Sequence, residues 1–125
     1  MRLNWSKSHR LLSSFEFERC YEHGRKYYTK NFILFVKSRG DGPDGMRLGL
    51  TVSRKKGPAV VRNRIKRVMR EFFRINQQKF QTRLDIVFVP KRSLDGRKIS
   101  FGLAEKELLP VVERINRDLE SATQQ

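Results

Sequence analysis

The hydrophobic positions of the chain follow two kinds of pattern, and the first of them is helical. Apolar side chains recur at the spacing of one helical face at Phe17, Cys20 and Tyr21. This spacing predicts a helix over residues 14–23 with aromatic groups on one side. Ser13 and Glu16 match a capping box, in which the serine accepts from the Glu16 N–H and the glutamate reaches back. Leu12 and Phe17 match a hydrophobic staple, and Gly24 is a typical C-terminal stop.

The second pattern is that of strands. Residues 27–37 are expected to be extended, and their apolar run from Phe32 to Val36 predicts a strand that is covered on both faces or lines a groove. Residues 46–53 alternate, with four apolar side chains on one face: Met46, Leu48, Leu50 and Val52. Turn residues at positions 40–45 separate the two segments. We therefore expect the two segments to pair as an antiparallel hairpin.

The second half of the chain predicts a helix, a strand and a helix. Pro58 at a first helical position favours a helix that runs to about residue 78. Residues 84–89 predict a short buried strand that Pro90 ends. A helical repeat of apolar positions then extends over residues 100–121. Pro110 lies inside this repeat, where it either kinks the helix or marks its true start, and the sequence leaves both open.

The order of elements is helix, strands, helix, strand, helix, which is typical of an α+β fold. We expect one domain over residues 1–125, built as a small two-layer sandwich with helices covering one face of the sheet. Residues 1–10 are predicted to form an extended basic arm and residues 120–125 a disordered tail.

The charge of the chain indicates its class of partner. Lys and Arg number 28 against 13 Asp and Glu, which gives a formal net charge of +15. Such a surface repels itself and attracts polyanions, and it far exceeds what a small domain needs to remain in solution. Nucleic acid is therefore the expected partner, with an anionic membrane surface as a distant second. The apolar share of 38% is enough for a folded core.

Cysteine and histidine are too few for a disulfide framework or a zinc site. Cys20 is the single cysteine, and His9 and His23 are the two histidines. We find no apolar stretch typical of a signal peptide or of a bilayer span. The expected location is the cytoplasm, and we expect no membrane contact.

The segment from Ala59 to Arg74 is the most informative part of the chain. It has one apolar stripe, formed by Val61, Ile65, Val68, Met69, Phe72 and Phe73. The other sides are basic, and Glu71 is their single acid. Like charges spaced four residues apart on a helix are unfavourable, so the density of arginine indicates phosphates on this face in the functional state. The alternatives are a solvated basic face, or a helix that binds a membrane or a calmodulin-like partner. The latter favours lysine and exposed apolar groups, whereas here arginine dominates and the apolar stripe is needed for the core.

The same segment resembles a known signature. Val61-Arg62-Asn63-Arg64-Ile65-Lys66-Arg67-Val68-Met69-Arg70-Glu71 is similar to the Arg-Asn-Arg motif of the bacterial ribonuclease P protein family. Further matches are Arg10-Leu11, Phe17, Tyr21, Gly24, Phe32 to Phe35, Leu48 to Lys55 and Asp85 to Val89. The resemblance covers roughly residues 10–120 with nearly the spacing of the family.

This resemblance implies a fold, two RNA-binding surfaces and a role. The fold would be helix, three strands, helix, strand, helix, with a left-handed crossover around the motif helix, against the general rule. The residues that would bind the ribonuclease P RNA are Arg62, Asn63, Arg64, Lys66, Arg67 and Arg70. The residues that would line a cleft for the 5′ leader of precursor tRNA are Phe17, Tyr21, Phe35, Arg54, Lys55 and Lys91. Bases stack on aromatic rings with little sequence preference, which suits a variable leader, although core packing is an alternative role for these rings. The chain departs from the family at Val89-Pro90-Lys91-Arg92, where many members carry Ala-Arg or Ala-Lys.

No catalytic site is visible in the sequence. Asp41 and Asp44 fit a turn, and neither histidine has a partner for acid–base chemistry. The resemblance implies that Mg²⁺, bound mainly by the RNA subunit and the substrate, performs the hydrolysis, with no catalytic residue and no metal ligand on the protein. The partners would be ribonuclease P RNA and precursor tRNA, with no obligate protein partner. Three rivals remain: a ribosomal or translation-type RNA-binding protein, a double-stranded DNA binder, and an autonomous nuclease.

Overall fold

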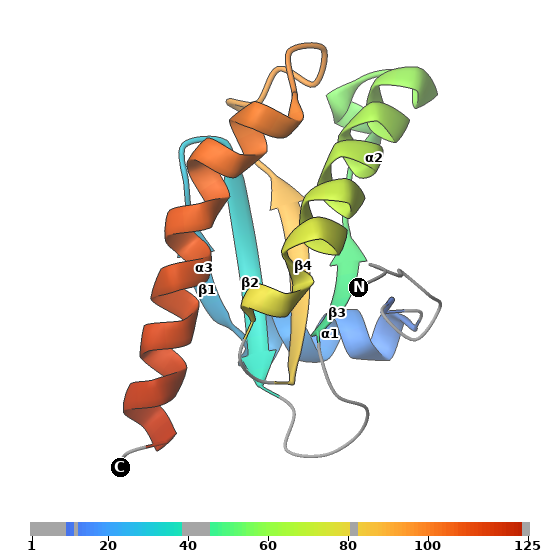
Figure 1. The fold of residues 1–125 in the computed structure, drawn as a ribbon. Coiled ribbons are helices and arrows are strands. Elements are labelled where there is room, and N and C mark those ends of the chain that lie inside the picture. Colours follow the sequence, from blue (N-terminus) through green and yellow to red (C-terminus); the bar gives the residue numbers. More distant parts are fainter. Residues whose placement is uncertain (1–9, 12, 39–45, 81–82, 124–125) are drawn as a thin grey trace.

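A computed structural model of the chain describes residues 10–11, 13–38, 46–80 and 83–123 (Figure 1). Its elements, in chain order, are α1 (Ser14–His23), β1 (Arg25–Tyr28), β2 (Phe32–Ser38), β3 (Met46–Leu50), the 3₁₀ turn η2 (Arg54–Lys56), α2 (Ala59–Asn76), the 3₁₀ turn η3 (Gln77–Lys79), β4 (Leu84–Pro90) and α3 (Phe101–Thr123). The predicted order of elements and the α+β class are confirmed. Predictions for the arm up to residue 9, for Leu12 and for the turn at 40–45 lie outside the described residues.

The described strands form one sheet in the order β1-β2-β4-β3. β1 and β2 are antiparallel, β2 and β4 are antiparallel, and β3 and β4 are parallel. The predicted hairpin between 27–37 and 46–53 is therefore wrong: β4 lies between β2 and β3, and the first segment is itself two strands. The physical reason is burial, since six of the seven residues of β4 are buried and such a strand belongs in the centre of the sheet.

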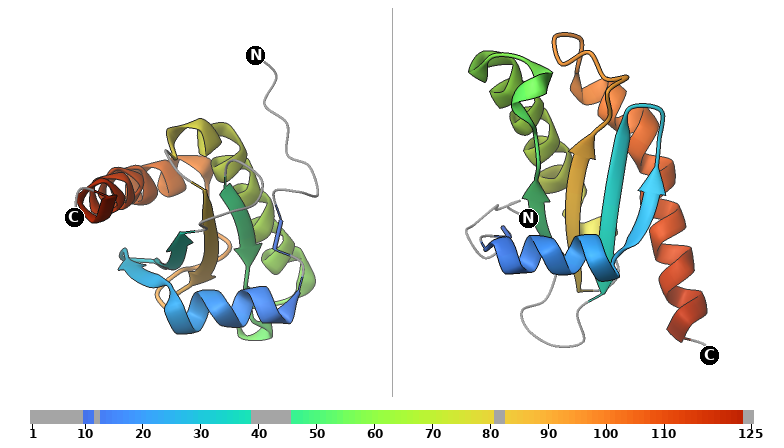
Figure 2. Two further views of the ribbon diagram at one scale, coloured as in Figure 1. Left: turned by 90° about the horizontal axis from the view of Figure 1, so that it is seen from below. Right: turned by 180° about the vertical axis from the view of Figure 1, so that it is seen from behind.

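Helices lie on both faces of this sheet. α2 and α3 cover one face, while α1 crosses the other face (Figure 2). The expectation that helices cover one face thus holds for α2 and α3 only. The apolar run in β2 is covered on both sides as predicted: Phe32, Leu34 and Val36 lie in the main core, and Phe35 packs in the smaller cluster beneath α1.

An ion-pair cluster fastens α1 to the sheet. Arg47 on β3 donates to both carboxylate oxygens of Asp85 on β4, each at 2.8 Å, and pairs with Glu16 on α1 at 2.8 Å. The predicted serine half of the capping box is present, because the Glu16 N–H donates to Ser13 Oγ at 3.2 Å. The Glu16 carboxylate, however, accepts from Ser13 Oγ and pairs with Arg47 instead of capping the Ser13 N–H. Asp85, and to a smaller extent Glu16, raise the pKa of Arg47, so its guanidinium stays charged.

Both later helices differ from their predicted bounds by a residue or two. Pro58 occupies the N-cap of α2 and not its first helical position, and η3 continues the helix to Lys79. α3 starts at Phe101, where Ser100 Oγ accepts from the Leu103 N–H at 3.1 Å, so Pro110 lies inside the helix and does not begin it.

The C-terminal part of α3 corrects the predicted tail. Residues 120–123 are helical where the sequence predicted disorder, and residues 124–125 lie outside the described part. The helix continues past Leu119, the last residue of the apolar stripe, because extending a formed helix needs only one further backbone hydrogen bond per residue. The hand of the crossover from β3 through α2 to β4 stays a prediction.

Candidate nucleic-acid interface

The apolar stripe of α2 fixes which of its side chains face outward. Ile65, Met69, Phe72 and Phe73 are completely buried in the main core. Because a helix has 3.6 residues per turn, the polar residues between these positions must lie on the sides and the outer face. The core therefore orients the basic residues, and the predicted stripe is confirmed.

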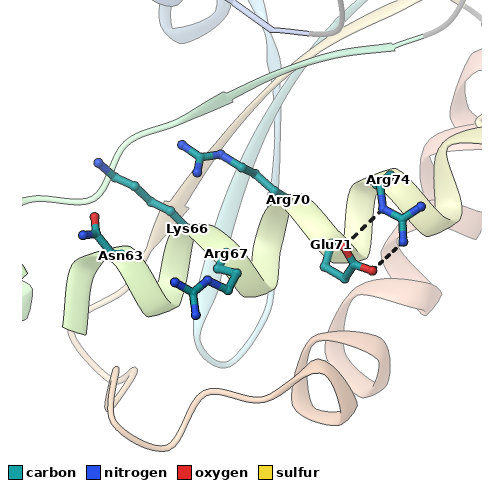
Figure 3. Close-up of a pocket in the computed structure, with 6 residues that line it drawn as sticks. All are labelled: Asn63, Lys66, Arg67, Arg70, Glu71 and Arg74. Carbon is teal, nitrogen blue, oxygen red and sulfur yellow. Dashed lines mark hydrogen bonds and ion pairs between the residues drawn. The ribbon is translucent and has the colours of Figure 1, made fainter. Parts of the chain in front are cut away.

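Four of the six predicted RNA-binding residues line one groove on α2. Asn63, Lys66, Arg67 and Arg70 form it together with Glu71 and Arg74 (Figure 3). Lys66 and Arg70 project to one side of the helix, whereas Arg67 leans to the side where the segment before α3 runs (Figure 3). The volume of the groove is about 360 Å³. Its lining includes four cationic side chains, a composition that suits an anionic ligand such as phosphate.

Glu71 is the acid of this groove, and Arg74 neutralises it. Arg74 Nη2 donates to Glu71 Oε1 at 2.5 Å and Arg74 Nε donates to Glu71 Oε2 at 3.1 Å. This contact lowers the pKa of the Glu71 carboxyl and raises that of Arg74. The negative charge is thereby held at the C-terminal end of the groove, away from Asn63.

The other two predicted RNA-binding residues also contact the protein backbone. Arg62 Nε donates to the carbonyl of Gly57 at 3.2 Å. Arg64 Nη2 and Nε donate to the carbonyl of Ile99, at 3.2 and 3.4 Å. Since a guanidinium has five N–H groups, each arginine keeps donors for a ligand. Arg64 thus also ties α2 to the segment before α3.

The three aromatic residues predicted for the leader cleft share one cluster between α1 and the sheet. Tyr21 and Phe35 meet edge to face, with ring centroids 4.8 Å apart. The Tyr21 hydroxyl and Thr51 Oγ1 share a hydrogen bond of 2.7 Å. All three rings are half-buried, so they combine the core role with a partly accessible surface.

Phe17 lies where the two predicted surfaces meet. Its ring packs over Gly49, where an added Cβ would lie 2.6 Å from the ring. It also lines a pocket of about 160 Å³ with Lys66 and Arg70 of α2. Sequence reasoning did not find this junction, because nothing local relates residue 17 to residue 66.

The basic residues predicted for the cleft are placed unequally. Arg54 and Lys55 are exposed in η2. Lys91 is half-buried, and its ammonium donates to the carbonyl of Thr29 at 2.6 Å and lies 5.5 Å from the ring centre of Tyr28. Lys91 therefore also fastens the β1–β2 turn to the segment after β4.

Two lysines near the cleft were missed. The Lys26 ammonium lies 5.7 Å from the ring centre of Phe35, because the register of β1 and β2 pairs these two residues, and the sequence does not show that register. The Lys56 ammonium donates to the carbonyls of Lys91 and Leu94, and burial lowers the pKa of Lys56. Lys56 holds the segment that carries Lys91, but in sequence it looks the same as its neighbour Lys55.

The residues that the structure describes contain neither a candidate metal site nor a candidate membrane span. Within these ranges, no three His, Cys, Asp or Glu side chains gather as a metal site. No helix in the same part of the chain has both the length and the apolar character that crossing a membrane requires.

Comparison with known proteins gives a consistent result. The model of the family described as Ribonuclease P matches residues 5–116. The ribonuclease P protein component of Maridesulfovibrio salexigens is 66% identical over 93% of this chain and 94% of its own. That of Oleidesulfovibrio alaskensis is 46% identical over 88% of each chain. Among solved structures, the RNase P protein from Thermotoga maritima superposes with a TM-score of 0.75 at 31% identity, over 84% of this chain and 96% of that chain. The Staphylococcus aureus protein gives a TM-score of 0.74 at 27% identity, over 87% of this chain and 96% of that chain.

Proposed function

The chain belongs to the ribonuclease P protein family, and we propose that it binds the ribonuclease P RNA through the outer face of α2 and the 5′ leader of precursor tRNA beneath α1. Its function is that of the protein subunit of a ribonucleoprotein endoribonuclease that removes the leader during tRNA processing. Membership of this family argues against the three rival functions, which are a ribosomal or translation-type RNA-binding protein, a double-stranded DNA binder and an autonomous nuclease.

The observation that carries the RNA-subunit proposal is the groove on α2. Lys66, Arg67 and Arg70 line it, and its acid is already paired with Arg74. Each phosphate that these cations neutralise releases condensed counterions, so binding is driven by charge and falls with salt. Arginine adds bidentate contacts to phosphate.

The leader proposal rests on the aromatic cluster with its neighbouring cations. Stacking of a base on an exposed aromatic face contributes about 1–3 kcal/mol and tolerates any base. Lys26 over the ring of Phe35, Lys55 in η2 and Lys91 after β4 would supply cations for the backbone of a single strand. A leader of variable sequence needs this kind of contact.

The proposal includes the metal ions and the place of action. Mg²⁺ would be bound mainly by the RNA subunit and the substrate, and the protein would lower the Mg²⁺ requirement by neutralising phosphate repulsion. We expect no obligate protein partner. The free, buried thiol of Cys20 is compatible with the reducing cytoplasm in which we place the protein.

The first test is cleavage of a 5′-extended precursor tRNA at low Mg²⁺. The reactions contain the protein alone, its cognate RNA subunit alone, or both. We expect rapid cleavage in the mixture only. Activity of the protein alone would reveal a protein active site, and no gain from the mixture would contradict the proposed function.

The second test concerns the groove itself. Arg67→Ala and Arg70→Ala should each weaken binding to the RNA subunit about tenfold, because a charge-assisted hydrogen bond is lost. Each should also reduce the slope of log K against log salt by about one. Arg117→Ala is the matched control. It makes the same change in net charge at an exposed site on α3 that does not line the groove. Equal losses in all three variants would mean that net charge, and not the groove, determines the affinity.

A further inference from the structure

A second pocket lies on the other side of α2, against the start of α3. It is lined by Val60, Asn63, Arg64, Arg67, Val68, Ile99, Ser100 and Phe101, and its volume is about 590 Å³. This lies within the range of about 300–1,000 Å³ in which proteins bind small organic groups. It shares Asn63 and Arg67 with the groove of Figure 3 but, unlike that groove, it has an apolar wall.

The apolar wall is formed by two elements that the fold brings together. Val60, in the first turn of α2, is 79% exposed. Phe101 begins α3, is half-buried, and rests on Phe72 with ring centroids 6.3 Å apart at 49°. The core thus fixes the Phe101 ring while it still lines the pocket. A rigid ring beside an exposed apolar side chain is a suitable surface for another flat ring.

The polar wall attracts anions. Arg64 is positioned by its hydrogen bonds to the Ile99 carbonyl, and Arg67 leans toward the same side. The N-terminus of the 23-residue helix α3 opens here with no acidic residue in its first turn, so its dipole adds positive potential. Among the residues that the structure describes, no acidic side chain lines the pocket.

We propose that this pocket holds one unpaired nucleotide of the RNA subunit, with its base against Phe101 and Val60 and a phosphate against Arg64 and Arg67. This inference rests on the proposed function, since it names a contact within the same RNA interface. A nucleotide combines a flat apolar ring and an anion a few ångströms apart, and the two walls offer the complementary surfaces. An RNA helix presents its phosphates but hides its base faces, so a paired segment would leave the apolar wall without a partner.

Crosslinking in the assembled holoenzyme tests the occupant. A photoreactive benzoylphenylalanine replaces Val60 in the full chain, and the crosslinked nucleotide of the RNA subunit is mapped by primer extension. The same group at Ile75, which is 39% exposed near the other end of α2, is the control. We expect position 60 to crosslink to one nucleotide that chemical probing shows as unpaired in the free RNA and protected in the complex. A crosslink to paired nucleotides, to precursor tRNA or to another protein would overturn the inference.

Failure of this inference differs from failure of the proposed function. If the holoenzyme assembles and cleaves but position 60 gives no RNA crosslink, the pocket assignment is wrong and the proposed function stands. If the unmodified chain does not assemble with the RNA subunit, both are wrong.

Substitutions give a second measurement. Val60→Ser and Phe101→Leu should each weaken binding to the RNA subunit roughly tenfold, because the base loses an apolar contact in the first variant and its aromatic stacking surface in the second. Val60 is so exposed that its replacement leaves the fold intact even if Phe101→Leu disturbs the contact with Phe72. Ile75→Ser is the matched control and should change binding little. Unchanged affinity for Val60→Ser would overturn the inference.

Discussion

At the scale of single residues, the sequence shows which side chains are charged or aromatic. It does not show all the groups that these side chains contact in the fold. Arg62 and Arg64 look equivalent to Arg67 in the motif, yet they donate to the carbonyls of Gly57 and Ile99. Ile99 comes near α2 only after the chain has folded, so no local pattern reports it. The aromatic cluster was predictable, because Phe17 and Tyr21 share a helical face, and the resemblance added Phe35.

Phe17 allows the leader proposal to be tested. Phe17→Leu keeps an apolar group over Gly49 but removes the aromatic face. We expect affinity for leader-bearing precursor to fall about tenfold, and affinity for mature tRNA to change little, because only the leader stacks there. Phe15→Leu, on the same helix with a ring that is 63% exposed, is the control. Equal losses for precursor and mature tRNA would contradict the assignment of Phe17 to the leader.

Cys20 gives a prediction for stability at alkaline pH. The thiol is completely buried beneath α1, and burial, with a smaller contribution from Asp85, raises its pKa from 9.0 to about 11. Because the pKa is higher in the folded state, the contribution of the protonated thiol to the free energy of unfolding is complete below about pH 9. It is lost as the pH rises through about 11. The loss should reach about 2–3 kcal/mol. Tyr27, whose pKa burial raises to about 12, extends the decline.

Urea unfolding at pH 8 and pH 10.5 measures this effect. Cys20→Ala lowers stability at both pH values by its lost packing, but the difference between the two should be smaller than in the unmodified chain. An equal difference in both proteins would show that the thiol does not titrate as expected.

At the scale of elements, period and capping residues predicted most boundaries within one or two residues, because they act locally. Strand pairing was not predictable in the same way: alternation shows that residues 46–50 are extended but not which strand lies beside them. The buried character of residues 84–89 was visible in sequence and is the property that places β4 between β2 and β3.

Gly24 was correctly predicted to end α1, but for a different reason than expected. Its backbone is extended, with φ −76° and ψ 151°, so no left-handed conformation requires glycine there.

Close packing is what requires glycine at position 24. A Cβ there would lie 2.4 Å from the carbonyl oxygen of Cys20 and 3.3 Å from the backbone nitrogen of Val36. Gly24→Ala should therefore lower the free energy of unfolding by about 1–3 kcal/mol, because α1 must shift from β2. Gly102→Ala is the matched control, since its Cβ would meet Ser100 Oγ at 3.9 Å, an ordinary van der Waals contact, in the first turn of α3. It should stabilise the protein by about 0.5–1 kcal/mol. Thermal unfolding followed by circular dichroism measures both, and stabilisation by both substitutions would contradict this account.

At the scale of the whole molecule, the fold separates two demands that the sequence places on the same helix, α2. The core needs the apolar stripe of α2, and the RNA needs the basic residues beside it. Placing α1 on the opposite face of the sheet leaves the outer side of α2 uncovered and creates the aromatic cluster (Figure 2). Phe17 joins the two surfaces through the pocket that it shares with Lys66 and Arg70. A leader and an RNA subunit bound at these places would lie next to each other.

The net charge of +15 makes folding and RNA binding respond to salt in opposite directions. In the free protein the cations repel one another, and salt screens this repulsion. Raising KCl from about 50 to about 500 mM should therefore raise the melting temperature by a few degrees. The same change should weaken binding to the RNA subunit by about a thousandfold or more, because counterion release then drives association less. Calorimetry of the protein alone and filter binding across the same salt series measure the two effects. A melting temperature that falls with KCl would mean that ion pairs such as those of Arg47, and not the repulsion between unpaired cations, dominate the electrostatic free energy of the fold.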